Sequence, residues 1–345
     1  MPYYLFFYDY LLFNKLNWVY FKDNYIKGDD IMLNLTLLGS GGTMPTPERF
    51  LSSLIIDYKG RKILMDCGEG TQVAMRKFNT GFRTLDIICI THLHGDHIYG
   101  LPGLLATIGN SNRTEPLTII GPMHIKKLIE EIILPITYAP FGIYVVESPN
   151  EDLGLSIIEE GLRIVEESNS TEMTLSTIEL DHSAPCLGYS FYLKRHPKFI
   201  VEKAMGNGVP REIWKALQHG ESFELNGRLY KPEMVLGDKR KGIKLSYITD
   251  SRSIDNIVPF IKDSDLLICE GTYGDDEDIQ KAKAHMHMTF GEAANLARKG
   301  KVRDLLLTHF SQTMDDPREY KDNATKIFHN TAIGYDGWKK TLKYR

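Results

Sequence analysis

The first half of the chain alternates short apolar runs with segments of helical periodicity. The apolar runs span four to seven residues and are bounded by turn residues, which is typical of buried strands. They are Leu33–Leu38, Leu51–Asp57, Lys62–Met65, Leu85–Ile90 and Leu117–Ile120. Helices are predicted at Gly70–Phe78 and His124–Ile133. Asp66 and Glu69 are predicted to cap the first helix, with Asp66 structural rather than a metal ligand.

The second half keeps the same rhythm of strands and helices. Several strand-like segments lie between Ile157 and Thr177, and further strands are predicted at Cys186–Leu193, Leu245–Thr249, Asp265–Cys269 and Asp304–Leu307. Helices are predicted at Ile254–Ile261 and Phe290–Lys299, the second with Thr289 as N-cap and Glu292 as its capping-box partner. Strands alternating with helices predict an α/β fold with packed layers.

Lys194–Gly242 interrupts this rhythm. It contains predicted helices near Val201–Met205 and Arg211–His219 and a short hairpin around Asn226-Gly227, and it is rich in Lys and Arg. We interpret it as an insertion between two strands. A solvated surface excursion without a role is the alternative.

Possible metal ligands follow the strand Leu85–Ile90 at high density. The stretch THLHGDH holds His92, His94, Asp96 and His97 within six residues. Imidazole and carboxylate at this density suit zinc or a similar divalent ion. His92 and His94 are expected to point the same way as the strand ends. Gly95 then lets the backbone turn, so Asp96 and His97 could serve a second ion.

Further candidate ligands lie at other strand ends. His182 stands before a proline and an apolar strand, although such a histidine in isolation is more often a surface or core residue. Asp250 follows a strand, as do Glu270 and His309, and His285 and His287 precede the helix that Thr289 caps.

Charge and cysteine content narrow the class of protein. The net charge is −4, so binding of nucleic acid would need a local basic patch. The four cysteines, Cys67, Cys89, Cys186 and Cys269, form no C-x-x-C pair, which suits a reducing cytoplasm and argues against a cysteine-based zinc site.

Residues 1–31 are expected to be an extension. The apolar run Tyr3–Phe13 contains Asp9, is too short to span a bilayer and is a poor signal peptide, so no membrane association is expected. We favour Met32 as the native start, with an interfacial or dimer-contacting aromatic arm as the alternative.

The pattern H-x-H-x-D-H resembles the motif of the metallo-β-lactamase superfamily, and the extension IYGLPGLL narrows the resemblance to ribonuclease Z. The resemblance runs from about Met32 to the C-terminus. It implies a four-layer αβ/βα sandwich over 32–345, with the insertion 194–242 resembling the arm that grips transfer RNA. It also implies an endoribonuclease that removes the 3′ trailer of precursor tRNA by metal-hydroxide attack, in a homodimer.

The same resemblance assigns residues to roles. The first ion takes His92, His94 and His182, the second takes Asp96, His97 and His309, and Asp250 bridges the two. Zinc is expected at both positions, with manganese as the alternative. Asp96 resembles the proton acceptor, His287 the general acid, with His285 as its local competitor, and Glu270 the residue that orients His287. Ser311 or the backbone N–H groups of Gly39–Gly42 are further candidates for contacting phosphate.

Two departures from the family pattern keep other functions open. The loop Met44–Ser53 reads MPTPERFLSS instead of the basic P-x-K-x-R-N pattern, and the Glu270 loop reads CEGT instead of HEAT. The alternative is therefore a phosphodiesterase of the same fold acting on another substrate, such as a cyclic nucleotide. A non-catalytic RNA-binding scaffold would require a broken site, yet every ligand position is filled.

Overall fold

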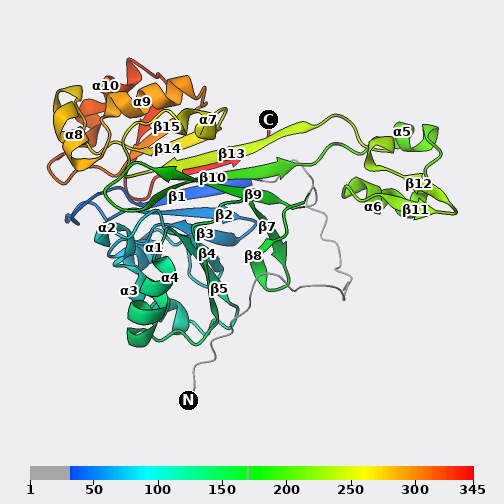
Figure 1. The fold of residues 1–345 in the computed structure, drawn as a ribbon, viewed down its shortest axis with the longest axis horizontal. Coiled ribbons are helices and arrows are strands. Elements are labelled where there is room, and N and C mark those ends of the chain that lie inside the picture. The colour runs from blue at the N-terminus through cyan, green and yellow to red at the C-terminus, as the bar shows by residue number, and fades with distance from the viewer. Residues whose placement is uncertain (1–31, 169–170) are drawn as a thin grey trace.

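The computed structural model describes residues 32–168 and 171–345, so the predicted extension 1–31 lies outside the described residues. Two mixed sheets pack face to face (Figure 1). The first has seven strands, in the spatial order β17 (Lys339–Lys343), β1 (Met32–Gly39), β2 (Ser53–Tyr58), β3 (Arg61–Met65), β4 (Leu85–Cys89), β5 (Leu117–Gly121) and β6 (Ile143–Glu147).

The second sheet has eight strands. Their order is β16 (Thr331–Ile333), β15 (Leu305–Thr308), β14 (Leu266–Glu270), β13 (Arg240–Ile248), β10 (Cys186–Arg195), β9 (Met173–Leu180), β7 (Leu153–Ile158) and β8 (Gly161–Val165). Strands β13 to β16 run parallel, and so do β3 to β6 of the first sheet. The carboxyl ends of parallel strands meet at one edge of a sheet, which is where α/β proteins usually build their sites.

Helices cover the outer face of each sheet, which completes four layers (Figure 1). The first sheet carries α1 (Thr71–Lys77), α2 (Gly95–Ile98), α3 (Leu101–Gly109), α4 (Ile125–Lys127) and the π-helical turn Leu128–Ile133. The second carries α7 (Ile257–Ile261), α8 (Ile279–His285), α9 (Phe290–Lys299) and α10 (Lys321–Thr325). Among the described residues, no helix is long and apolar enough to cross a membrane.

Alternation along the strands explains the layers. In β2, Leu54 and Ile56 lie in the core between the sheets, whereas Ile55 packs against the outer helices. In β14, Ile268 lies between the sheets and Leu267 faces α7 and α9. Because successive strand residues point to opposite faces, a strand buried on both faces must be apolar at nearly every position.

The segment between β10 and β13 projects far from the sandwich (Figure 1). It contains α5 (Val201–Gly206), α6 (Trp214–Gln218), β11 (Phe223–Leu225) and β12 (Arg228–Tyr230), close to the helices and hairpin predicted there. A small apolar cluster that includes Ala204 and Leu217 holds it together. Its two ends meet, because Gly237 N donates a hydrogen bond to Lys198 O at 2.8 Å.

Several sequence predictions need correction. No side chain caps α1: its N-cap is Gly70 at φ 83°, and the Asp66 carboxylate is directed elsewhere. The predicted helix His124–Ile133 consists of α4 followed by a π-helical turn. Strand β13 begins at Arg240, five residues earlier than predicted. Its first residues are polar, but they still pair with β10, where Arg240 lies opposite Arg195. The capping box of Thr289 and Glu292 on α9 is confirmed.

Candidate metal centre

Four loops converge at the carboxyl edge of the two sheets. His92, His94 and the short helix α2 follow β4, and His182 lies between β9 and β10. Asp250 and His309 follow β13 and β15. Asp250 and His309 adopt left-handed backbone angles, with φ of 52° and 58°. Such angles are uncommon for non-glycine residues and are concentrated at functional sites, where the surrounding structure holds them.

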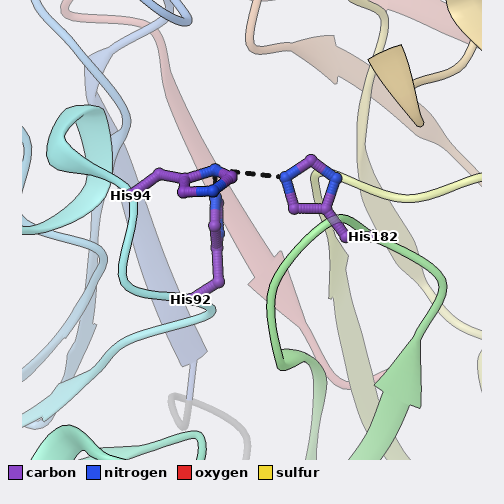
Figure 2. Close-up of side chains that lie close together, drawn as sticks. All are labelled: His92, His94 and His182. Carbon is purple, nitrogen blue, oxygen red and sulfur yellow. Dashed lines mark hydrogen bonds between the residues drawn. The ribbon is translucent and has the colours of Figure 1, made fainter. Parts of the chain in front are cut away.

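The first group of side chains contains three histidines (Figure 2). His92 Nε2 lies 3.0 Å from His94 Nδ1, and His182 Nε2 lies 3.2 Å from the same atom. Figure 2 shows the three rings close together, with His92 and His94 on one loop and His182 on another. Ring nitrogens that converge in this way form a pocket of lone pairs suited to a divalent ion.

The second group contains Asp96, His97, Asp250 and His309. His97 Nε2 lies 3.2 Å from His309 Nε2, and Asp96 Oδ2 lies 3.3 Å from His309 Nε2. His97, His309 and Asp250 are almost fully buried. Charged or lone-pair-bearing groups at this density are stable inside a protein only when they are paired or coordinate a metal.

Asp250 joins the two groups. Its Oδ2 lies 3.5 Å from His92 Nε2 and 3.9 Å from His182 Nε2. Its Oδ1 lies 3.4 Å from His97 Nε2 and 3.2 Å from His309 Nε2. One carboxylate oxygen therefore faces each group, which a histidine at this position could not achieve.

The outward nitrogen of most of these rings has its own oxygen partner. His97 Nδ1 lies 2.9 Å from Asp66 Oδ2, and His309 Nδ1 lies 3.1 Å from Thr272 Oγ1. His92 Nδ1 lies 3.1 Å from Thr91 Oγ1. A hydrogen bond from Nδ1–H fixes the tautomer that leaves the Nε2 lone pair free for a metal. The donor set, nitrogen and carboxylate oxygen without thiolate, fits zinc.

Burial and neighbouring charges shift the pKa values of these side chains. Burial, together with the neighbouring His97, holds the pKa of His92 well below its usual value. Burial opposes the charged form of Asp250, but His309, His97 and His92 outweigh it and hold the Asp250 pKa well below its usual value. These shifts favour neutral imidazole at His92 and carboxylate at Asp250, the forms that bind metal. At His97 burial lowers the pKa, but the Asp250 and Asp66 carboxylates outweigh it and hold that pKa well above its usual value.

His287 and Glu270 lie beside the second group and form a third cluster with its member His309. His287 Nδ1 lies 3.2 Å from Glu270 Oε2, and Glu270 also accepts hydrogen bonds from Ser251 N, Thr272 Oγ1 and Met288 N. Burial lowers the pKa of His287, but the Glu270 carboxylate outweighs it and raises that pKa to about 9. Glu270 thus holds the His287 ring in one orientation and favours its protonated form.

Sequence reasoning missed three supporting residues. Asp66, predicted as a structural helix cap, accepts hydrogen bonds from Thr91 N at 2.8 Å and from Tyr247 Oη at 3.3 Å while it faces His97. Thr91 and Thr272 contact ring nitrogens of the histidine clusters. The only sequence signal was their position at strand ends beside candidate ligands.

The Gly39–Gly42 loop lies against the centre, but not as predicted. Ser40 N donates to Asp336, Gly41 N to Phe50 O and Gly42 N to Phe310 O, so these backbone donors are already used within the protein. They are therefore poor candidates for contacting phosphate. The loop's closeness to the site has another consequence, since a Cβ atom on Gly42 would come within 2.5 Å of His309 Cε1.

The structure thus brings together all seven residues predicted as ligands, in the two groups expected. Comparison with known proteins identifies the family of this chain. The chain is 58% identical over 316 residues to ribonuclease Z of Alkaliphilus oremlandii, covering 91% of this chain and 100% of that protein. The chain belongs to the ribonuclease Z family.

Other comparisons agree with the ribonuclease Z family and with the fold. Human tRNase Z, short form, superimposes with a TM-score of 0.61 at 26% identity, covering 89% of this chain and 98% of that one. The metallo-β-lactamase fold protein YhfI from Bacillus subtilis superimposes with a TM-score of 0.61 at 18% identity, over 90% and 100% of the two chains. Family models match residues 33–135 (Anti-Pycsar protein Apyc1) and 234–310 (Beta-lactamase superfamily domain).

These findings confirm the predicted family, the metallo-β-lactamase fold and a metal-dependent endoribonuclease of the ribonuclease Z type. The histidine and aspartate clusters are consistent with a metal site in such an enzyme. The individual ligand and catalytic assignments stay predictions, as do the identity and number of the ions.

Proposed function

We propose that this chain removes the 3′ trailer of precursor tRNA by hydrolysing one phosphodiester at a centre that holds two zinc ions. The observation that carries the proposal is the carboxylate of Asp250, with one oxygen toward each histidine group. The test is to incubate the purified zinc-loaded chain with several precursor tRNAs and to map the 5′ end of the released trailer. Absence of a cut beside the discriminator nucleotide contradicts the proposal.

The residues would divide the ions as the geometry groups them. His92, His94 and His182 would hold the first, and Asp96, His97 and His309 the second, with Asp250 shared. Bound there, two divalent ions would activate a water molecule and neutralise charge on the phosphodiester. Metal analysis of the purified chain should find about two zinc ions per chain, and manganese in their place would change only the identity of the ions.

Asp96 is the proposed proton acceptor. Its Oδ2 accepts a hydrogen bond from Thr43 N at 2.7 Å and lies 3.3 Å from His309 Nε2. These contacts fix the carboxylate at the exposed side of the second group, within reach of a water molecule that enters from solvent.

His287 is the proposed general acid. Because Glu270 engages Nδ1, Nε2 is left to donate a proton to the leaving oxygen. His287→Asn should lower RNA cleavage by roughly 10²–10⁴-fold, the usual worth of a general acid. Turnover of a p-nitrophenyl phosphodiester should fall far less, since p-nitrophenolate leaves without a proton. The matched control is His285→Asn, and equal loss on both substrates contradicts the role.

The projecting insertion 194–242 is proposed to grip the precursor tRNA. It carries eleven Lys and Arg residues against six Asp and Glu, whereas the whole chain has a net charge of −4. A basic element that projects from an acidic enzyme attracts the phosphate backbone locally. Its distance from the sandwich supports a contact remote from the cleaved bond (Figure 1). The division into an extension, 1–31, and a hydrolase domain, 32–345, completes the proposed organisation.

We also propose a cytoplasmic homodimer. Free, buried thiols at all four cysteines support a reducing compartment. Exposed apolar side chains on the helical face of the first sheet, among them Ile132 and Ile136, the latter 73% exposed, support a second copy as the partner. Light scattering during gel filtration tests this, and Ile136→Glu should yield monomers if that face is the interface.

A second candidate function is hydrolysis of another phosphodiester, such as a cyclic nucleotide. The observation that favours it is the loop Met44–Ser53, which lacks the basic family pattern. Parallel assays distinguish the two functions: cyclic nucleotide turnover faster than trailer removal would favour the second candidate.

A further inference from the structure

Tyr99 stands out at the rim of the metal centre. It directly follows helix α2, which carries Asp96 and His97, and its side chain is 70% exposed. None of the steps proposed above uses it. A tyrosine side chain combines a large apolar ring with a polar hydroxyl, so covering the ring with a ligand or partner is favourable.

The ring of Tyr99 is held over the backbone of Gly95. A Cβ atom built on Gly95 would overlap the Tyr99 ring, so the absence of a side chain there lets the ring lie against the backbone. Tyr99 N donates a hydrogen bond to Gly95 O at 2.9 Å, which fixes the turn. Gly95 separates His94 from Asp96, one predicted ligand of each ion, so the ring lies within one residue of both groups.

The ring is also free to receive a ligand. Within residues 32–168 and 171–345, no aromatic ring or cationic group stacks on it. Nearby, Thr43 N donates a hydrogen bond to the Asp96 carboxylate, and the next residue, Met44, is 54% exposed.

We propose that Tyr99 is a stacking platform for an unpaired nucleobase next to the cleaved phosphodiester. The inference rests on the proposed function, which brings single-stranded RNA to this rim. Proteins recognise single-stranded RNA by stacking splayed bases on aromatic rings, and such stacking tolerates any base. The platform would set the register of the strand across the two ions without reading its sequence.

The test is a double-mutant cycle between Tyr99 and the substrate. Tyr99→Leu keeps an apolar side chain but removes the π-face, whereas Tyr99→Phe keeps it. Each variant is assayed on precursor tRNA and on precursors with an abasic nucleotide at either position flanking the cut. Tyr99→Leu should lower kcat/KM by roughly tenfold or more on the intact precursor, and Tyr99→Phe should stay within about twofold of the unsubstituted chain.

The two losses should not add. On the precursor that lacks the stacked base, Tyr99→Leu should have little further effect. The control is Tyr144→Leu, an exposed tyrosine on β6 at the far edge of the first sheet. Zinc content and oligomeric state are measured for every variant, and both should be unchanged.

The outcomes separate this inference from the function on which it rests. Cleavage by the unsubstituted chain with additive losses at both abasic positions overturns the inference alone. A change in oligomeric state on Tyr99→Leu, with losses equal on all substrates, also overturns it and assigns the ring to a protein interface. Failure of the unsubstituted chain to cut the precursor overturns the proposed function and the inference with it.

Discussion

Asp66 provides the sharpest test of how the centre is built. This fully buried carboxylate lies behind His97, with Oδ2 2.9 Å from Nδ1, and it accepts from Thr91 N at 2.8 Å through Oδ1. Asp66→Asn keeps the size of the side chain but replaces one oxygen with an NH₂ group. If the amide oxygen still accepts the hydrogen bond from Thr91 N, the NH₂ group faces the Nδ1–H of His97, and two donors meet.

The conflict is relieved when the His97 proton moves from Nδ1 to Nε2. Nδ1 then accepts from the amide, but the protonated Nε2 can no longer bind a metal. Loss of such a carboxylate–histidine contact typically lowers metal affinity by about 10–100-fold, which corresponds to about 1.4–2.7 kcal/mol. The loss should fall on the second group, which contains His97, and spare most of the affinity of the first.

The assay is zinc binding by competition with a chromogenic chelator, with the stoichiometry measured by mass spectrometry. Asp66→Asn should bind its first zinc nearly normally and its second about 10–100-fold more weakly. The exposed residue Asp322 on α10 supplies the matched control, Asp322→Asn. Circular dichroism of the metal-free chains checks that the fold survives. Unchanged affinity for the second zinc would refute the reasoning, and equal weakening of both ions would point to general loosening.

Three further predictions follow from other contacts. Asp86→Ala leaves the buried guanidiniums of Arg113 and Arg163 without their shared carboxylate. The free energy of unfolding, measured in urea, should fall by about 3–5 kcal/mol, and a fall below about 1 kcal/mol would contradict this role of Asp86. Gly42→Ala pushes on His309 and should remove close to one zinc per chain, whereas Gly206→Ala, with open space around it, should not. Replacing 198–237, whose ends meet, by a short glycine linker should weaken trailer removal but spare small diesters; equal loss on both would refute the gripping role.

Much of the fold was predictable because strands and helices carry their periodicity locally. The buried runs β1 to β5 and the capping box on α9 need only neighbouring residues to be read. Edge strands were harder to see. Strand β6 is only half buried, and β16 is three residues long, so neither has the continuous apolar run of a central strand.

The sequence by itself determined the dense ligand cluster. His92, His94, Asp96 and His97 lie within six consecutive residues, so the pattern can be recognised without knowing the fold. Only the tertiary structure decided that Asp250 lies between the two groups, with one carboxylate oxygen facing each. It also decided that Asp66 supports His97 instead of capping a helix. The physical reason is that these contacts join residues far apart in the sequence, such as Asp66 and His97. Which donors a carboxylate meets therefore depends on chain topology, which local periodicity does not encode.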